Sequence, residues 1–180
     1  MAKLEMGQKL PEFTYDTPFE RGLSMSRTAE AVQGKTALVF LRYYGCTLCQ
    51  LDLRDYAKSI EQVKAAGGQL LVVLQSDPDA LADQLKEHPL PYPIVCDPEQ
   101  KLYKQFEIRP AASKLGMADP KTVAKIMRAR KEGLQHGAYE GEELQLPACF
   151  VVDREMNLTY VHDGKSAADV PNAGELTALL

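Results

Sequence analysis

The stretch Phe40-Leu41-Arg42-Tyr43-Tyr44-Gly45-Cys46-Thr47-Leu48-Cys49-Gln50-Leu51 decides the fold of this chain. It follows an apolar, β-branched run from Thr36 and leads directly into a helical pattern, so two thiols stand where a strand gives way to a helix. A helix N-terminus carries partial positive charge and unpaired N–H groups, which make a thiol there easier to ionise. Cysteines three residues apart share one helical face, close enough for a disulfide. The stretch therefore predicts a redox site.

The apolar positions after Cys49 give the two thiols different surroundings. Leu53, Tyr56, Ile60 and Val63 follow Cys49 at steps of four, three, four and three, the spacing of one buried helical face. The pattern predicts a helix that is stopped by Gly67-Gly68. It places Cys49 on the buried face and leaves Cys46, just before the helix, as the exposed and accessible sulfur.

Apolar runs that predict buried strands alternate with helical patterns through the first part of the chain. The strands are expected at 36–41, 69–75 and 91–97, and the helices after them begin near Cys46, Pro78 and Pro98. This β-α-β-α-β-α order predicts right-handed crossovers and helices on both faces of the sheet. A short strand pair and a helical turn are expected at 13–16, 23–25 and 26–30, and a closing hairpin and helix at 146–153, 158–162 and 173–180.

Residues 109–145 interrupt this alternation and are interpreted as a helical insertion that packs near the active-site end of the sheet. Asp119-Pro120 predicts the start of a helix, whose apolar stripe would be Val123, Ile126 and Met127. Between residues 109 and 131 the sequence has seven basic residues and one acid. This basic face is interpreted as solvent-exposed. The alternative is that Lys125, Arg128 and Lys131 steer an acidic protein partner to the thiols.

Composition limits the classes of protein to which the chain can belong. Its 180 residues are 45% apolar and 26% charged, and we expect residues 1–180 to form one soluble domain. The net charge of −4 argues against nucleic acid or an anionic membrane as a partner. Neither a signal peptide nor an apolar run of about 18 residues is present, which predicts a cytoplasmic protein. In that reducing compartment a disulfide scaffold is not expected of four cysteines.

Three segments in this order resemble the thioredoxin fold, most closely the thioredoxin-like branch of the alkyl hydroperoxide reductase/thiol-specific antioxidant (peroxiredoxin) superfamily. Gly7 to Thr14 is similar to that family's N-terminal extension, Val39 to Cys49 to the Cys-x-x-Cys segment of its peroxiredoxin-like members, and Leu146 to Asp153 to its later strand. The resemblance implies an α/β fold with a central mixed β-sheet flanked by helices, here with a helical insertion before the proline-led strand. It also implies an antioxidant oxidoreductase.

The chain departs from the peroxiredoxin pattern at three positions. Family members present the peroxidatic cysteine in a Pro-x-x-x-Thr-x-x-Cys motif, with an arginine from a later strand. If Cys49 took the peroxidatic place, Cys46 would replace the threonine, Arg42 the proline and Pro147 the arginine. Pro147 instead resembles the cis-proline that faces the Cys-x-x-Cys of thioredoxins and leaves a backbone edge open for a substrate chain. These departures favour disulfide exchange over peroxide reduction.

Three functions follow from these residues. The first is a thiol-disulfide oxidoreductase, in which the Cys46 thiolate attacks a substrate disulfide and Cys49 resolves the mixed disulfide. The second is a thiol-dependent peroxidase with Cys49 peroxidatic and Cys46 resolving, and the third a non-enzymatic redox-sensing or partner-binding module. The expected partner is a disulfide-bearing protein or a small thiol, or a peroxide in the second case. The sequence leaves the oligomeric state open.

Other residues are weighed as secondary candidates. Arg42 and Tyr44 adjoin the thiols and, with Pro147, are the candidates for substrate binding; Arg42 can lower the pKa of a thiol if its side chain points toward it. Cys96 and Cys149 are interpreted as buried core thiols, with Cys149 as the one that can line the site. The three histidines are scattered, and no zinc-ligand spacing or nucleotide motif occurs, so we expect neither metal nor cofactor.

Overall fold

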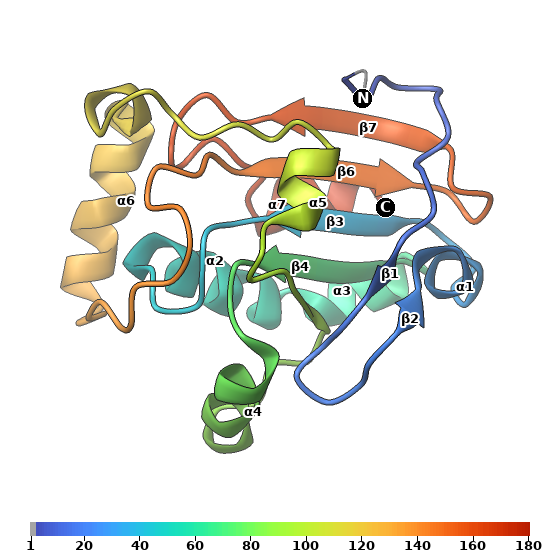
Figure 1. Ribbon diagram of the computed structural model, residues 1–180, viewed down its shortest axis with the longest axis horizontal. Coiled ribbons are helices and arrows are strands. Elements are labelled where there is room, and N and C mark those ends of the chain that lie inside the picture. The colour runs from blue at the N-terminus through green and yellow to red at the C-terminus, as the bar shows by residue number, and fades with distance from the viewer. Residues whose placement is uncertain (1–2) are drawn as a thin grey trace.

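The structure is a computed structural model that describes residues 3–180. A five-stranded sheet in the order β5-β4-β3-β6-β7 forms its centre (Figure 1). β3, β4 and β5 are parallel, whereas β6 is antiparallel to β3 and β7 is antiparallel to β6. The strands are β3 (Thr36–Phe40), β4 (Gln69–Leu74), β5 (Ile94–Cys96), β6 (Ala148–Val152) and β7 (Leu158–Asp163). The mixed α/β sheet predicted from the sequence is confirmed.

β3 is the central strand, and all of its residues are buried. A strand covered on both faces requires apolar side chains at successive positions, which is why the nearly continuous apolar run folds in this place. Phe40, its last residue, lies opposite Val73 of β4 and Ala148 of β6. The strand that leads into the two cysteines is therefore fixed from both sides.

Helices cover both faces of the sheet, each over its own apolar cluster (Figure 1). Alternation along β3 sends Val39 into the first cluster and Phe40 into the second. The first cluster lies under α2 (Thr47–Lys58), α3 (Ile60–Ala65), α4 (Pro78–Glu87) and α7 (Ala173–Ala178). The second lies under α1 (Met25–Glu30), α5 (Lys101–Gln105) and the N-terminal segment. The predicted two-sided covering is confirmed.

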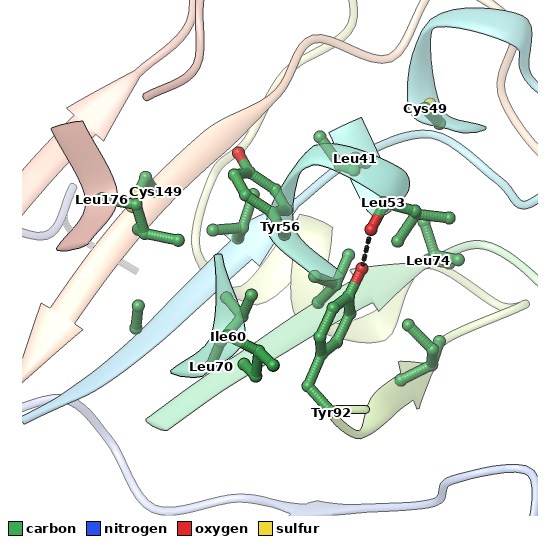
Figure 2. Packing of buried hydrophobic residues seen from close by; sticks show 14 of the residues in the cluster. Leu41, Cys49, Leu53, Tyr56, Ile60, Leu70, Leu74, Tyr92, Cys149 and Leu176 are labelled. Carbon is green, nitrogen blue, oxygen red and sulfur yellow. Dashed lines mark hydrogen bonds between the residues drawn. The ribbon is translucent and has the colours of Figure 1, made fainter. Parts of the chain in front are cut away.

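The first cluster extends along one face of the sheet, from the cysteine pair to β6. Figure 2 shows Cys49 of α2 at one end of the drawn residues and Cys149 of β6 at the other. Between them, the hydroxyl of Tyr92 donates a hydrogen bond of 2.6 Å to the carbonyl of Leu53, which ties the segment before β5 to α2. The packed stripe of α2 thus continues the core up to Cys49.

One predicted helix is two helices in the structure. The stripe from Cys49 to Val63 predicted a single helix, but α2 ends at Lys58 and α3 begins at Ile60. Ser59 between them has φ −104° and ψ 6°, outside the helical region, and its N–H bonds the carbonyl of Tyr56 three residues back. Serine has a lower intrinsic helix propensity than alanine or leucine, which makes a break at this position less costly. The apolar residues on both sides of the break stay buried, so the core prediction holds.

The expected N-terminal strand pair is present as β1 (Thr14–Tyr15) and β2 (Leu23–Ser24), antiparallel to each other. α1 follows β2 at once, with the Ser24 side chain accepting from the N–H of Arg27. This segment lies over the second cluster, where Phe13 and Tyr15 are buried. Within residues 3–180, no helix combines the length and apolar character needed to cross a bilayer.

The insertion contains a short 3₁₀ helix, η1 (Leu115–Met117), and the helix α6 (Pro120–Lys131), which Asp119 caps as predicted. α6 packs on α2 beside the end of the sheet where β3 and β4 finish (Figure 1). The predicted apolar stripe is wrong as a packing face, because Val123 is 51% and Met127 64% exposed. Thr122 and Ala129 are the buried residues of α6, and the half-buried Lys125 contacts Asp52 of α2. A polar contact with α2, described below, takes the place of an apolar one.

A buried tyrosine on α5 holds the end of β3 in place. The hydroxyl of Tyr103 lies 2.6 Å from the carbonyl oxygen of Leu41 and 3.0 Å from that of Val73. We expect Tyr103→Phe to lower the free energy of unfolding by about 1 to 2 kcal/mol, because a buried acceptor loses its donor. Urea unfolding followed by circular dichroism measures the loss. Tyr139→Phe, at a side chain 70% exposed, is the control and should leave the midpoint unchanged.

Candidate active site

Cys46 is the N-terminal cap of α2. Its backbone is extended, with φ −63° and ψ 124°, and its sulfur accepts a hydrogen bond of 3.3 Å from the N–H of Cys49. The N–H groups of a first helical turn have no partner within the helix, so a side-chain acceptor at the cap satisfies one of them. Here the sulfur of Cys46 is that acceptor, and it faces the positive end of the helix.

Arg42 supplies a second positive group to the same sulfur. Its Nη2 donates a 3.1 Å hydrogen bond to Cys46 Sγ, and its Nη1 donates a 2.7 Å bond to the carbonyl of Glu143. The guanidinium also lies over the ring of Tyr43, 5.8 Å from its centroid. The N–H of Gln75 fixes the carbonyl of Arg42 at 2.8 Å. The Arg42 side chain therefore points toward the thiols, an orientation that the sequence had left open.

These contacts separate the two thiols chemically. The hydrogen bond from the Cys49 thiol and the charge of Arg42 lower the pKa of Cys46 to about 6. Burial raises the pKa of Cys49 well above its usual range, and the neighbouring Cys46 sulfur raises it further. A thiolate is the nucleophilic form of cysteine. At neutral pH Cys46 is therefore the ionised sulfur and Cys49 the protonated one that donates to it.

Residues 135–145, which we call the strap, close over the cysteines from the insertion side. The N–H of Gly137 donates to the carbonyl of Gly45 at 2.8 Å, and Nε2 of Gln50 donates to the carbonyl of Gln135 at 2.9 Å. The phenol of Tyr43 bonds the carboxylate of Glu143 and lies 3.0 Å from Nε2 of His136. The prediction that the insertion packs at the active-site end is confirmed.

The strap makes one prediction about Cys46 wrong. The sequence placed Cys46 outside as the accessible sulfur, but its side chain is 0% exposed and that of Cys49 is 4% exposed. The cause is the close approach of the strap to Gly45, where a Cβ atom would lie 2.4 Å from the carbonyl oxygen of Ala138. Only a cavity of about 10 Å³ remains beside the thiols. Its lining residues are Leu41, Arg42, Cys46, Leu48, Cys49, Asp52, Gln145, Pro147 and Ala167.

Comparison with known protein families decides the relationship of this chain. Residues 6–161 match the profile of the AhpC/TSA family, which covers most of the sequence. The chain belongs to the AhpC/TSA family. The resemblance drawn from its three sequence segments is thereby confirmed, and membership supports a thiol-based oxidoreductase or peroxidase.

Solved structures share the fold of this AhpC/TSA chain at low sequence identity. Peroxidoxin BcpB from Mycobacterium tuberculosis is 12% identical with a TM-score of 0.70, over 98% of this chain and 96% of its own. A thiol peroxidase from Chromobacterium violaceum is 15% identical with a TM-score of 0.66, over 99% and 87%. A putative thiol:disulfide interchange protein DsbE from Chlorobium tepidum is 18% identical with a TM-score of 0.60, over 98% and 97%. No curated protein sequence matches the chain.

Pro147 lines the thiol cavity of this AhpC/TSA chain, as a residue facing the Cys-x-x-Cys should. The expectation of a cis-proline is wrong, because no peptide bond within residues 3–180 is cis. The trans form is the favoured one for a residue–proline bond. The carbonyl of Pro147 accepts a 2.8 Å hydrogen bond from the N–H of Gly164, so this acceptor is occupied within the protein.

Tyr44 lies away from the thiol cavity. It lines a separate groove of about 630 Å³ between α2 and α4, together with Leu53, Arg54 and Leu90. Its role in substrate binding stays a prediction. The neighbouring Tyr43, which the sequence analysis did not select, is the aromatic residue that reaches the strap. Tyr43 and Glu143 are a hundred positions apart, and no local pattern joins them.

The two remaining cysteines lie in the core. Burial raises the pKa of both Cys96 and Cys149 to about 12, which keeps them protonated. Cys149 does not line the thiol cavity, so its candidate role there is not supported. Within residues 3–180 no cluster of three histidine, cysteine or acidic side chains has the geometry of a metal site.

The basic face of α6 is partly engaged by α2. Lys125 Nζ lies 2.5 Å from the buried carboxylate of Asp52, and Arg128 forms a two-pronged ion pair of 2.6 and 2.7 Å with Asp55. Lys125 is therefore not part of a solvated face, whereas Arg128 is ion-paired but remains 45% exposed. The steering of an acidic partner stays a prediction. Asp52 was not singled out in the sequence, although its position three residues after Cys49 on one helical face is a signal for it.

The contact of Arg42 with Cys46 predicts a measurable change in reactivity. Thiolate alkylation in the wild type should rise with pH around an inflection near 6. Arg42→Met should move that inflection to higher pH, because the thiolate loses a hydrogen-bonded cation. Iodoacetamide labelling followed by mass mapping of Cys46 measures both profiles. Arg54→Met, at an exposed arginine of α2, should leave the inflection where it is; an unshifted Arg42→Met profile would refute the assignment.

The backbone of Gly45 lies so close to Gly137 of the strap that one methyl group added at residue 45 should displace the strap. Gly45→Ala should push residues 137 and 138 outward and speed the labelling of Cys46 by a bulky maleimide. The labelling rate is measured at a pH where Cys46 is fully ionised, so that access alone is compared. Gly116→Ala is the matched control, since its Cβ would meet ordinary contacts at 3.7 and 3.8 Å. Equal rates for both variants would mean that the strap does not limit access.

Proposed function

We propose that this chain is a thiol-disulfide oxidoreductase in which Cys46 is the nucleophile and Cys49 the resolving thiol. The observation that carries the proposal is the difference between the surroundings of the two sulfur atoms. Both cysteines are buried, but Cys46 accepts hydrogen bonds from a guanidinium and a helix N–H, whereas Cys49 lies on the apolar stripe of α2. In such a pair, Cys46 is suited to attack the substrate disulfide, and Cys49 is suited to release the substrate by forming the disulfide with Cys46.

The reaction then proceeds in two exchanges. The Cys46 thiolate attacks one sulfur of a substrate disulfide, a bond forms between them, and the other substrate sulfur leaves with the electron pair of the broken bond. Cys49, once deprotonated, attacks the Cys46 sulfur and releases the first substrate thiolate. The substrate is reduced by two electrons and the Cys46–Cys49 pair is oxidised to a disulfide. A thiol reductant, either a dithiol protein or a small thiol, returns the pair to the starting state.

Arg42 has two tasks in this cycle. It stabilises the attacking thiolate, and it also donates to the carbonyl of Glu143 in the strap. A disulfide-bearing substrate requires more room than the present cavity of about 10 Å³, so the strap must move for attack. The proposal therefore includes opening of residues 135–145 before the first exchange.

A second candidate is peroxide reduction, which two observations favour. The cavity is near the size of a single water molecule and so suits a small substrate better than a disulfide. The guanidinium of Arg42 donates a hydrogen bond to Cys46 Sγ. Arg42 can therefore take the place of the later-strand arginine of peroxiredoxins, whose position is Pro147 in this chain. In this reaction the Cys46 thiolate attacks one peroxide oxygen and forms a sulfenic acid, and the alkoxide or hydroxide that leaves takes a proton from solvent to become an alcohol or water. Cys49 then displaces the sulfenic oxygen as water and forms the same disulfide.

The reverse assignment, with Cys49 peroxidatic, fits less well. Burial raises the pKa of Cys49 far above its usual range, so little of it is ionised at neutral pH. The arginine hydrogen bond goes to Cys46 rather than to Cys49. In both candidate reactions the geometry favours Cys46 as the attacking sulfur.

Cysteine substitutions test the assignment of roles. Cys46→Ser should abolish disulfide reduction, because the nucleophile is gone. Cys49→Ser should retain the first exchange and accumulate a mixed disulfide at Cys46, visible as an added mass in intact-protein spectrometry. Cys149→Ser is the control and should behave as wild type. Full activity of Cys46→Ser would overturn the proposal.

Peroxide and disulfide substrates are compared in the same variants. Stopped-flow mixing of the reduced protein with hydrogen peroxide and, separately, with an oxidised dithiol protein gives the two second-order rate constants. Fast oxidation by peroxide with slow reaction of the disulfide would favour the second candidate. The converse result would favour the first.

A further inference from the structure

His136 lies in the strap at a point where its own side chain meets those of Tyr43 and Glu143. Its Nε2 is 3.0 Å from the hydroxyl of Tyr43, and its Nδ1 is 2.7 Å from the carbonyl oxygen of Gly137. The same hydroxyl donates a hydrogen bond to the carboxylate of Glu143. These contacts form a continuous chain of three hydrogen bonds from Glu143 to Gly137, which we call the latch.

The latch joins the parts of the strap that lie against the cysteine loop. Gly137, at one end, also donates its N–H to the carbonyl of Gly45, the residue before Cys46. Glu143, at the other end, accepts through its backbone carbonyl a hydrogen bond from Nη1 of Arg42, whose Nη2 donates to Cys46 Sγ. Both ends of the latch are therefore held by direct neighbours of the Cys46 sulfur.

The protons of the latch can be counted from its acceptors. A backbone carbonyl and an ionised carboxylate accept hydrogen bonds but have no proton to donate. Tyr43 has one proton, which goes to Glu143, so its oxygen is left to accept from Nε2 of His136. Nδ1 of His136 must then donate to the carbonyl of Gly137. Two donating ring nitrogens require an imidazolium, because a neutral imidazole carries one proton.

The other place for the extra proton leaves this count unchanged. If Glu143 carried it, Glu143 would donate to Tyr43, Tyr43 to Nε2 of His136, and Nδ1 to Gly137, which again uses one proton more than the ordinary forms supply. A carboxyl group is ordinarily a stronger acid than an imidazolium by about two pH units, which places the proton on His136. Burial and the bond to Glu143 raise the pKa of Tyr43 well above its usual range, so the phenol keeps its own proton.

The charged groups around His136 act in both directions. The carboxylate of Glu143 favours the imidazolium. The ring of Tyr139 is stacked on the imidazole with the centroids 4.0 Å apart, and it also favours the imidazolium because an aromatic face attracts a cation. Arg42, whose guanidinium lies 5.8 Å from the ring centroid of the latch tyrosine, opposes it as a like charge. A thiolate at Cys46 favours it.

The other acids of the strap lie outside the latch. Glu140 accepts from the hydroxyl of Ser76 and from the N–H of Asp77, and Glu142 accepts from a backbone N–H within the strap. From α2, the neutral side chain of Gln50 contacts the strap through a backbone carbonyl. The proton count of the latch therefore depends on its own three side chains.

We propose that His136 is a positioning residue that holds the strap over Cys46 while both of its ring nitrogens carry a proton, and releases the strap when one proton is lost. The closed strap then binds one proton more than the open strap. Closure is therefore favoured at low pH and weakens as the pH rises through the titration of the imidazole. The proposal rests on the proposed function for its consequence, since an open strap is what a disulfide substrate requires at Cys46.

Hydrogen–deuterium exchange of the strap measures closure without using the thiol. The parent protein is Cys46→Ser, because serine is a good helix cap and the titration of the thiol is removed. The exchange rate of residues 135–145 is divided by the intrinsic rate at each pH, between about pH 5.5 and about 8.5, above the ordinary range of carboxyl groups. This ratio should rise with pH by up to about tenfold per unit, the limit for one proton.

Glu143→Gln is the sharpest variant because it keeps the shape of the latch and changes its proton count. The new amide can donate to the oxygen of Tyr43, Tyr43 to a neutral His136, and His136 to Gly137, so all three bonds form without the extra proton. The exchange ratio of this variant should stay low and nearly flat across the pH range. His136→Gln, which removes the titrating group, should also be flat. Tyr43→Phe removes the centre of the latch and should exchange fast at every pH.

His88→Gln is the matched control, at an exposed histidine that ends α4, and should keep the slope of the parent. A flat profile in the parent, or the parent slope in Glu143→Gln and His136→Gln, would overturn the proposal. Neither result concerns the roles of the thiols. Full disulfide reductase activity of Cys46→Ser would instead overturn the proposed function and leave the latch in place.

Discussion

The structure depends on one sulfur atom that both caps a helix and accepts a hydrogen bond from an arginine. Cys46 closes the first turn of α2 by accepting from the N–H of Cys49, and the same lone pairs receive Arg42. This arrangement requires that the strand before it end at one fixed place, which the burial and two-sided pairing of β3 provide. The position of β3, the start of α2 and the electrostatics of the Cys46 thiol thus depend on one another at the junction between this strand and this helix.

Much of the fold was predictable because its signals are local. The continuous apolar run of β3, the proline-led starts of α4 and α6 and the hairpin of β6 and β7 each lie within a short window and agree with one another. The break at Ser59 was missed because the buried stripe continues across it. The stripe of α6 was misassigned for the opposite reason, since its packing is decided by Lys125 and by acids of another helix.

The site was predictable only in part. The placement of the two thiols at the start of α2 follows from their spacing. Arg42 was a candidate through its nearness in sequence, but the direction of its side chain was left open. The burial of Cys46 does not, because the residues that cover it lie about ninety positions later and meet Gly45 through backbone rather than through a patterned side chain. A motif specifies which atoms react. Long-range packing specifies when they can be reached, and a single sequence carries little of that information.

Arg42 binds the sulfur with one nitrogen and the strap with another, which makes ionisation and closure thermodynamically linked. Because such coupling is reciprocal, a closed strap that orients the guanidinium favours the thiolate, and the thiolate in turn favours the closed strap. The most nucleophilic state is then also the most shielded one. A molecule small enough to enter the closed site would meet the fully ionised thiolate. A larger one would require the strap to open, which would move Arg42 and lower the ionised fraction of Cys46. In the proposed reaction, such an arrangement would act as a kinetic size filter, in which selectivity comes from the timing of exposure rather than from a shaped binding surface.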